Sequence, residues 1–134
     1  MINIIEFNQD GANNTTITID PNNPKGIVTM VGEYSLWGFR GEIELEYAVS
    51  GSVLTVRSRR AKFTTGGVSG KSQRFEIVGS SILALLPPQN GQWTTWSSSL
   101  EMTWASPTVL GFWFYFHIEP GGVTRYDSRL LTLL

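Results

Sequence analysis

The sequence predicts an all-β protein, with about ten antiparallel strands in a sandwich or a flattened barrel. Three observations predict this class. Apolar and polar residues alternate, as in strands with one buried face. Glycine (14 residues) and proline (6), with serine, threonine and asparagine, separate short runs rich in valine, isoleucine, threonine and aromatic residues. Signals for helices are almost absent, so we expect a single β domain over residues 1–134.

The expected strands are the apolar or alternating runs between these turn signals. The first hairpin turns at Asp10-Gly11, between runs that end at Phe7 and continue at Ile17. A later run alternates strictly, with Ile43, Leu45 and Tyr47 on one face and three glutamates on the other. The full set of expected strands is 2–7, 15–20, 26–31, 42–49, 53–63, 73–78, 81–86, 99–105, 109–118 and 129–134.

Several segments of the chain recur. Gly32–Trp37 resembles Gly91–Trp96, and Ile43–Ala48 resembles Leu100–Ala105. Two shorter matches follow in the same order: Val53-Leu54 with Val109-Leu110, and Gly66–Ser69 with Gly121–Thr124. A repeated unit is typical of a pseudo-symmetric fold, so we expect two repeats, at about 15–78 and 73–134, related by an approximate twofold axis.

The hairpin in the first repeat predicts an exposed ladder of charges. If Ser50-Gly51 forms a two-residue turn, Glu44 faces Arg57, Glu42 faces Arg59 and Glu46 faces Thr55. Cross-strand pairs of this kind contribute about 0.2–1 kcal/mol each. By the same alternation, we expect Arg60 and Lys62 to point to the other face, which divides this basic run.

The second repeat carries aromatic residues where the first has arginines. Trp113 and Tyr115 take these places, in a strand that is apolar on both faces up to His117. Such a strand needs a cover on each side. We expect a partner subunit in a homo-oligomer, with Trp113, Tyr115 and His117 at the interface. Burial by the chain's own packing is an equal alternative.

Composition excludes several kinds of chemistry. The chain has no cysteine, 10 basic and 11 acidic residues and a single histidine, His117, which stands among apolar neighbours. We find no nucleophile–base pattern, no metal-ligand spacing and no phosphate-binding loop, so we expect neither a cofactor nor a metal and favour a non-enzymatic protein. Because the charges are balanced, we do not expect a nucleic-acid partner. No signal peptide is recognisable, which favours the cytoplasm by default.

The recurring aromatic segments indicate a carbohydrate site. Aromatic rings stack on the apolar faces of sugars, and adjacent polar side chains bind the hydroxyl groups. The candidate ligand-binding residues are Trp37, Arg40, Gln92, Trp93, Trp96, Ser97 and Ser98. A competing interpretation places Trp37 and Trp96 in equivalent parts of the core, because large aromatic residues are usually much buried.

The sequence therefore favours a lectin-like binding protein, with three alternatives. One is a structural or assembly subunit that uses the Trp113/Tyr115 face. Another is a carrier of apolar ligands, with a cavity lined by Leu110, Phe112 and Phe114. The third is a membrane-active protein that inserts its aromatic strand at an interface.

Overall fold

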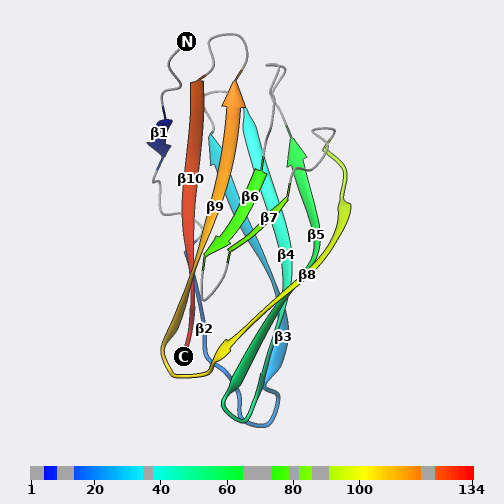
Figure 1. Ribbon diagram of the computed structural model, residues 1–134, viewed down its shortest axis with the longest axis vertical. Helices are drawn as coiled ribbons and strands as arrows, with labels where there is room; N and C mark the ends of the chain where they lie inside the picture. The colour runs from blue at the N-terminus through cyan, green and yellow to red at the C-terminus, as the bar shows by residue number, and fades with distance from the viewer. Residues whose placement is uncertain are drawn as a thin grey trace.

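The protein is a two-layer β structure. The computed structural model describes residues 5–8, 14–34, 38–64, 74–78, 82–85, 91–118 and 123–134, with side chains described at 14–34, 38–64, 91–116 and 126–134. The strands are β1 (Ile5–Asn8), β2 (Thr15–Ile17), β3 (Lys25–Tyr34), β4 (Phe39–Ser50), β5 (Val53–Thr64), β6 (Arg74–Val78), β7 (Ile82–Leu85), β8 (Thr94–Thr103), β9 (Thr108–Ile118) and β10 (Val123–Leu133). Figure 1 shows the long strands running along the vertical axis in two twisted layers.

The strands pair in two separate sheets. One has the order β3-β4-β5-β8 and is antiparallel throughout. The other has the order β1-β10-β9-β6-β7, and β2 also pairs with β10. Both β1 and β2 run parallel to β10, so the prediction of a purely antiparallel fold is wrong at this edge. Because β1 and β2 pair with different stretches of β10, the long C-terminal strand holds two short N-terminal ones.

The structure confirms the all-β class and a sandwich-like arrangement, but not a closed barrel. Side chains are described over most of the length of seven strands, β2–β5 and β8–β10, which is fewer than the ten strands predicted. Strands β1, β6 and β7 are described by their backbone pairing alone. The predicted repeat is not shown. Strands β4 and β5 pair in one sheet, whereas β8 and β9, at the equivalent positions, belong to different sheets.

The β4–β5 hairpin turns one residue later than predicted, at Gly51-Ser52. Ser50 pairs with Val53, and Gly51 has a φ of 59°. A positive φ at the first central position is what primed hairpin turns require, and glycine adopts it without strain. The charge pairs therefore shift, and Glu46 faces Arg57.

A bulge in β5 corrects a second prediction. Leu45 pairs with Ser58, but the preceding Glu44 pairs with Arg60, so Arg59 is an extra residue. One extra residue reverses the alternation beyond it. Arg60 and Lys62 consequently lie on the same side as Arg57, instead of the opposite side as predicted. Ala61, between them, is fully buried in their place.

The core fills the space between the sheets. Alternate residues of β9 are fully buried, and Phe116 packs at ring-centroid distances of 5.7 Å from Phe39 and 5.6 Å from Phe63. The members of the core are Met30, Phe39, Ile43, Leu45, Leu54, Val56, Ala61, Phe63, Trp96, Leu100, Leu110, Phe112, Phe114, Phe116, Leu131 and Leu133. They come from both sheets, which makes this one continuous hydrophobic core.

Strand β3 connects the two sheets at close range. A Cβ on Gly32 would lie 2.2 Å from Cδ2 of Phe114, so only glycine lets the strand approach β9 this closely. At the next residue, the backbone N–H of Glu33 donates to Oδ2 of Asp127 at 2.8 Å. The other carboxylate oxygen of Asp127 accepts from Nη1 of Arg129, and both side chains are fully buried. The sandwich thus encloses an ion pair that also binds the opposite sheet.

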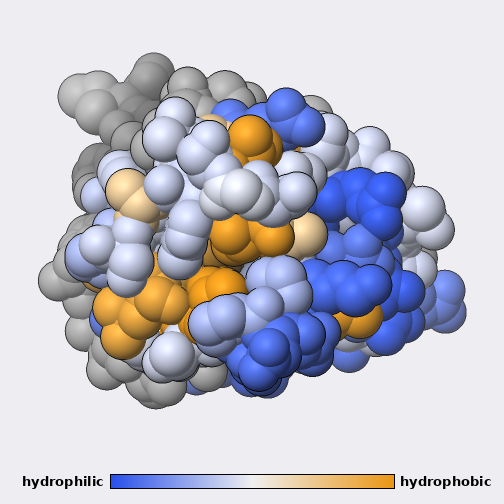
Figure 2. All heavy atoms as spheres, turned by 90° about the horizontal axis from the view of Figure 1, so that it is seen from below, coloured by the Kyte–Doolittle hydropathy of each residue, from blue (hydrophilic) through white to orange (hydrophobic). Residues whose placement is uncertain are grey.

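The lower end in Figure 1 holds the β4–β5 turn and the C-terminus. Viewed from this end, apolar residues lie among pale ones, and strongly hydrophilic residues gather on one side (Figure 2).

Candidate functional site

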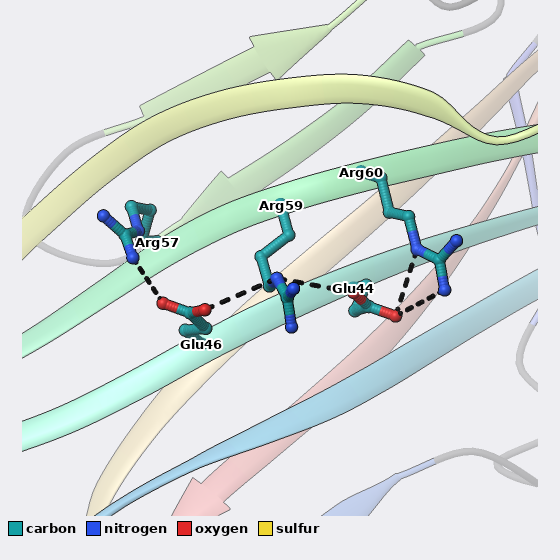
Figure 3. Close-up of polar contacts among 5 residues, drawn as sticks. All are labelled: Glu44, Glu46, Arg57, Arg59 and Arg60. Atoms are coloured by element: carbon teal, nitrogen blue, oxygen red, sulfur yellow. Dashed lines mark hydrogen bonds and ion pairs between the residues drawn. The ribbon is translucent and has the colours of Figure 1, made fainter.

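The solvent side of the β3-β4-β5-β8 sheet, which we call the charged face, carries two clusters of ion pairs. At its centre, Glu44 accepts from Nη2 of Arg60 at 3.1 Å, and the Nε of Arg59 lies 3.6 Å from Glu44 and 3.4 Å from Glu46 (Figure 3). Glu46 also accepts from Arg57 at 2.5 Å. The bulge makes this possible, because it places three arginines of β5 beside two glutamates of β4.

The second cluster reaches β3. Glu42 pairs with Lys62 at 3.0 Å and lies 3.8 Å from Arg40, which in turn donates to Glu33 at 3.2 Å. The glutamate side chains are 13–34% exposed, whereas the four arginines are 42–56% exposed. The carboxylates therefore lie low on the sheet, beneath more exposed guanidinium groups.

The pKa of Glu46 is lowered from its ordinary value of 4.5. The largest cause is the hydrogen bond from Arg57, followed on the lowering side by the charges of Arg57, Arg59 and Lys25. Glu46 is therefore ionised at neutral pH and serves as a fixed acceptor on the charged face.

Three of the predicted ligand-binding residues lie at the upper end of this face. Trp93 contacts two cations, with Cζ of Arg60 at 4.2 Å and Nζ of Lys62 at 5.0 Å from its ring centroid. Arg40 pairs with Thr64, the last residue of β5. Gln92 is exposed, and the N–H of the preceding Gly91 donates to the carbonyl of Phe63. The Trp93 ring already holds cations, so a sugar has less of its surface to stack on.

The other predicted residues lie elsewhere. Trp96 is buried in the core, as the competing interpretation proposed. Ser98 binds the buried Ser58, whose hydroxyl accepts from the Ser98 N–H at 2.9 Å and donates to its carbonyl at 3.2 Å. Ser97 is exposed on β8. Trp37 lies outside the described residues.

A groove of about 650 Å³ crosses the lower half of the charged face. It follows two adjacent rungs of the sheet. Its lining residues are Asn23, Lys25, Gly26, Ile27, Glu46, Tyr47, Ala48, Thr55, Arg57 and Ser99. One rung joins Lys25, Ala48 and Thr55, and the other joins Ile27, Glu46, Arg57 and Ser99. The depression follows from side-chain length, because the short Ala48, Thr55 and Ser99 lie among longer neighbours.

Sequence reasoning missed these groove residues. They are not conspicuous singly, and only the register brings them together from four strands. Alternation places Lys25 and Ile27 on the same side of β3, but the 55% exposure of Ile27 is evident only in the structure.

The opposite outer surface, formed by β9 and β10, carries stacked aromatic rings; we call it the aromatic face. Trp113 stacks on Tyr126 at 5.1 Å between centroids and 4° between planes, and Tyr115 stacks on Tyr126 at 5.6 Å. All three are half-buried, while Val109 (51%) and Leu130 (46%) beside them are exposed. The rings thus shield part of one another from solvent, so the chain itself supplies some of the burial expected for this strand. A partner subunit on this face stays a prediction.

The remaining candidates are His117 and the three residues named for an apolar cavity. His117 lies in β9, but its side chain is outside the described set. Leu110, Phe112 and Phe114 are packed in the core and do not line either of the pockets described here. Among the described residues, no group of three or more acidic or histidine side chains is arranged to hold a metal ion. Nor does that part of the chain contain a helix long and apolar enough to cross a membrane.

The chain matches no family model, no curated protein and no solved structure. Its function is therefore inferred from the geometry of its own residues.

Proposed function

We propose that this protein is a non-enzymatic binding protein for carbohydrate, and that the ligand lies in the groove of the charged face. The observation that carries the proposal is the composition of the two rungs. Thr55 and Ser99 offer hydroxyl groups, Arg57 offers N–H donors and Glu46 offers an ionised acceptor. A sugar has closely spaced hydroxyl groups that both donate and accept hydrogen bonds, so it can use all of these partners.

The groove also suits the apolar side of a sugar ring. Ile27 and Ala48 place aliphatic surface between the polar groups of the two rungs. A volume of about 650 Å³ lies within the roughly 300–1,000 Å³ that is usual for small-ligand sites. The proposal keeps the ligand class expected from the sequence but moves its site from the aromatic segments to the strands.

Screening against a glycan array, followed by calorimetric titration of the best sugar, tests the proposal. Ala48→Tyr should fill the groove and weaken binding by about tenfold or more, equivalent to at least about 1.4 kcal/mol. The matched variant Gln92→Tyr, at the upper end of the same face, should leave the affinity within about twofold. No binding to any sugar would remove the proposal. If only Gln92→Tyr weakened binding, the ligand would lie at the aromatic segment that the sequence indicated.

A further inference from the structure

A second pocket, of about 450 Å³, lies at the lower end of the sandwich; we call it the lower-end pocket. It is separate from the groove, with no lining residue in common. Its walls include Ile19 from the segment after β2, Pro24, Val49 near the end of β4, Trp104 after β8 and Leu134 after β10. The two sheets therefore both contribute to it, as expected for a site at the open end of a sandwich.

Backbone hydrogen bonds fix these walls. The N–H of Val49 donates to the carbonyl of Pro24 at 2.8 Å, and the N–H of Ile19 donates to the carbonyl of Leu134 at 2.8 Å. The N–H of Trp104 donates to the carbonyl of Ser52, in the β4–β5 turn, at 2.7 Å. Each wall segment is thus held to another, so the pocket is preformed and a ligand would not have to order it.

The lining is apolar and uncharged. Ile19, Val49 and Trp104 are half-buried and pack against the hydrophobic core, and Leu134 is 42% exposed at the rim. None of the lining side chains is charged, in contrast to the groove, where three are. Figure 2 shows apolar residues at this end, with the hydrophilic ones gathered to one side. An ionic ligand would lose its hydration here without a charged side chain in return.

We propose that the lower-end pocket binds a small, neutral, apolar molecule, with Val49 and Trp104 as its walls. The volume is within the usual range for such ligands. The pocket is open and lies between two turns, which contribute Pro21 and Gly51 to its lining, so it offers room for a small molecule. This site is independent of the proposed carbohydrate site.

Titration with the neutral fluorescent dye N-phenyl-1-naphthylamine tests this site. Two leucines provide a matched pair, because Leu134 lines the pocket at 42% exposure and Leu130, on the aromatic face, is 46% exposed. Leu134→Arg should weaken dye binding by about tenfold or more, and Leu130→Arg should leave it within about twofold. Both positions are partly exposed, so both variants should fold; their thermal unfolding, followed by circular dichroism, checks this.

A second pair tests the pocket volume. Val49→Phe should fill the pocket and weaken the dye, whereas Val53→Phe, at an exposed site of the same hairpin, should not. Absence of dye binding up to the solubility limit would overturn the proposal, as would equal affinities in both members of either pair. Light scattering supplies a third result. A mass that doubles with concentration, and that Leu134→Arg returns to one chain, would show a second copy as the occupant and would also overturn it.

Discussion

The charged face and the Asp127–Arg129 pair use the same chemistry in opposite surroundings. On the charged face, several glutamates and cations contact one another while their side chains remain 13–56% exposed. Inside the sandwich, a single carboxylate and a single guanidinium are fully buried. Water solvates the first group with or without its partners, but the second group has lost that solvation. Stability should therefore depend more on the one buried pair than on the larger number of exposed ones.

The largest effect should come from Asp127→Ala. It leaves the Arg129 charge buried without its carboxylate and removes the acceptor for the Glu33 N–H. Breaking a buried pair from one side costs about 3–5 kcal/mol, which urea denaturation would measure as a lower free energy of unfolding. The double variant Asp127→Leu/Arg129→Met should recover much of this loss. A loss below about 1 kcal/mol in Asp127→Ala would contradict the contrast between the two regions.

The next effect concerns the close approach of β3 to Phe114 of β9. Gly32→Ala places a methyl group against the packed Phe114 ring, and overpacking of this kind costs about 1–3 kcal/mol. Gly26→Ala is the control, because its Cβ would meet the side chain of Tyr47, which is half-buried and can move aside. Equal losses in thermal unfolding for the two variants would show that the approach at Gly32 is not especially tight.

The aromatic face lies between the two extremes, since its rings are half-buried. Trp113→Arg removes the stacking on Tyr126 and the tilted ring contact with Tyr115, for which we expect a loss of about 0.5–1.5 kcal/mol per ring pair in urea denaturation. If a second copy covers this face, the same variant should also reduce the mass measured by light scattering. An unchanged mass would speak against that interface without affecting the stacking.

A smaller effect should follow from Glu44→Gln, at the centre of the charged face. It weakens the contacts to Arg59 and Arg60, and exposed pairs contribute about 0.2–1 kcal/mol. Raising the salt concentration should shrink the difference from the unchanged protein, because salt screens exposed charges. A loss as large as that of Asp127→Ala would erase the distinction drawn above.

The smallest effect should be the acid dependence at Glu46. Its pKa is lower in the folded protein than its ordinary value of 4.5, chiefly through the hydrogen bond from Arg57. The stabilisation is therefore complete above pH 4.5 and is lost as the pH falls through the folded pKa. Urea midpoints of the unchanged protein and Glu46→Gln should converge on acidification. Parallel curves down to pH 3 would indicate that the Arg57 contact contributes nothing.

Alternation predicted the inner face of β4, and together with the turn residues and the near absence of helix signals it predicted the class of the fold. Ile43 and Leu45 are fully buried, as their spacing indicates. The position of the β4–β5 turn was predicted wrongly, because glycine favours a positive φ and both possible turns, Ser50-Gly51 and Gly51-Ser52, contain Gly51. Alternation also failed at Arg59, because the run of basic residues fits either face equally well and carries no apolar marker for the bulge.

The candidate site was less accessible to sequence reasoning than the fold. Trp93 was named from the sequence because aromatic side chains are conspicuous, but it does not line the groove, and its contacts with Arg60 and Lys62 depend on the bulge. The groove depends on register across four strands, which brings short side chains such as Ala48 and Ser99 to neighbouring rungs. Register of this kind is a long-range property that local patterns do not contain. The buried pair of Asp127 and Arg129 was equally hidden, because the sequence places two charged residues where polar ones usually mark an outer face.

The extra residue in β5 also constrains how this strand can change. Losing Arg59 would exchange the orientations of everything that follows, sending Arg60 and Lys62 inward while Ala61 and Phe63 met water. Insertions or deletions in the second half of β5 are therefore tolerable only if the total number of residues added or removed is even. The single residue Arg59 therefore determines which side chains in the second half of β5 face the solvent and which face the core.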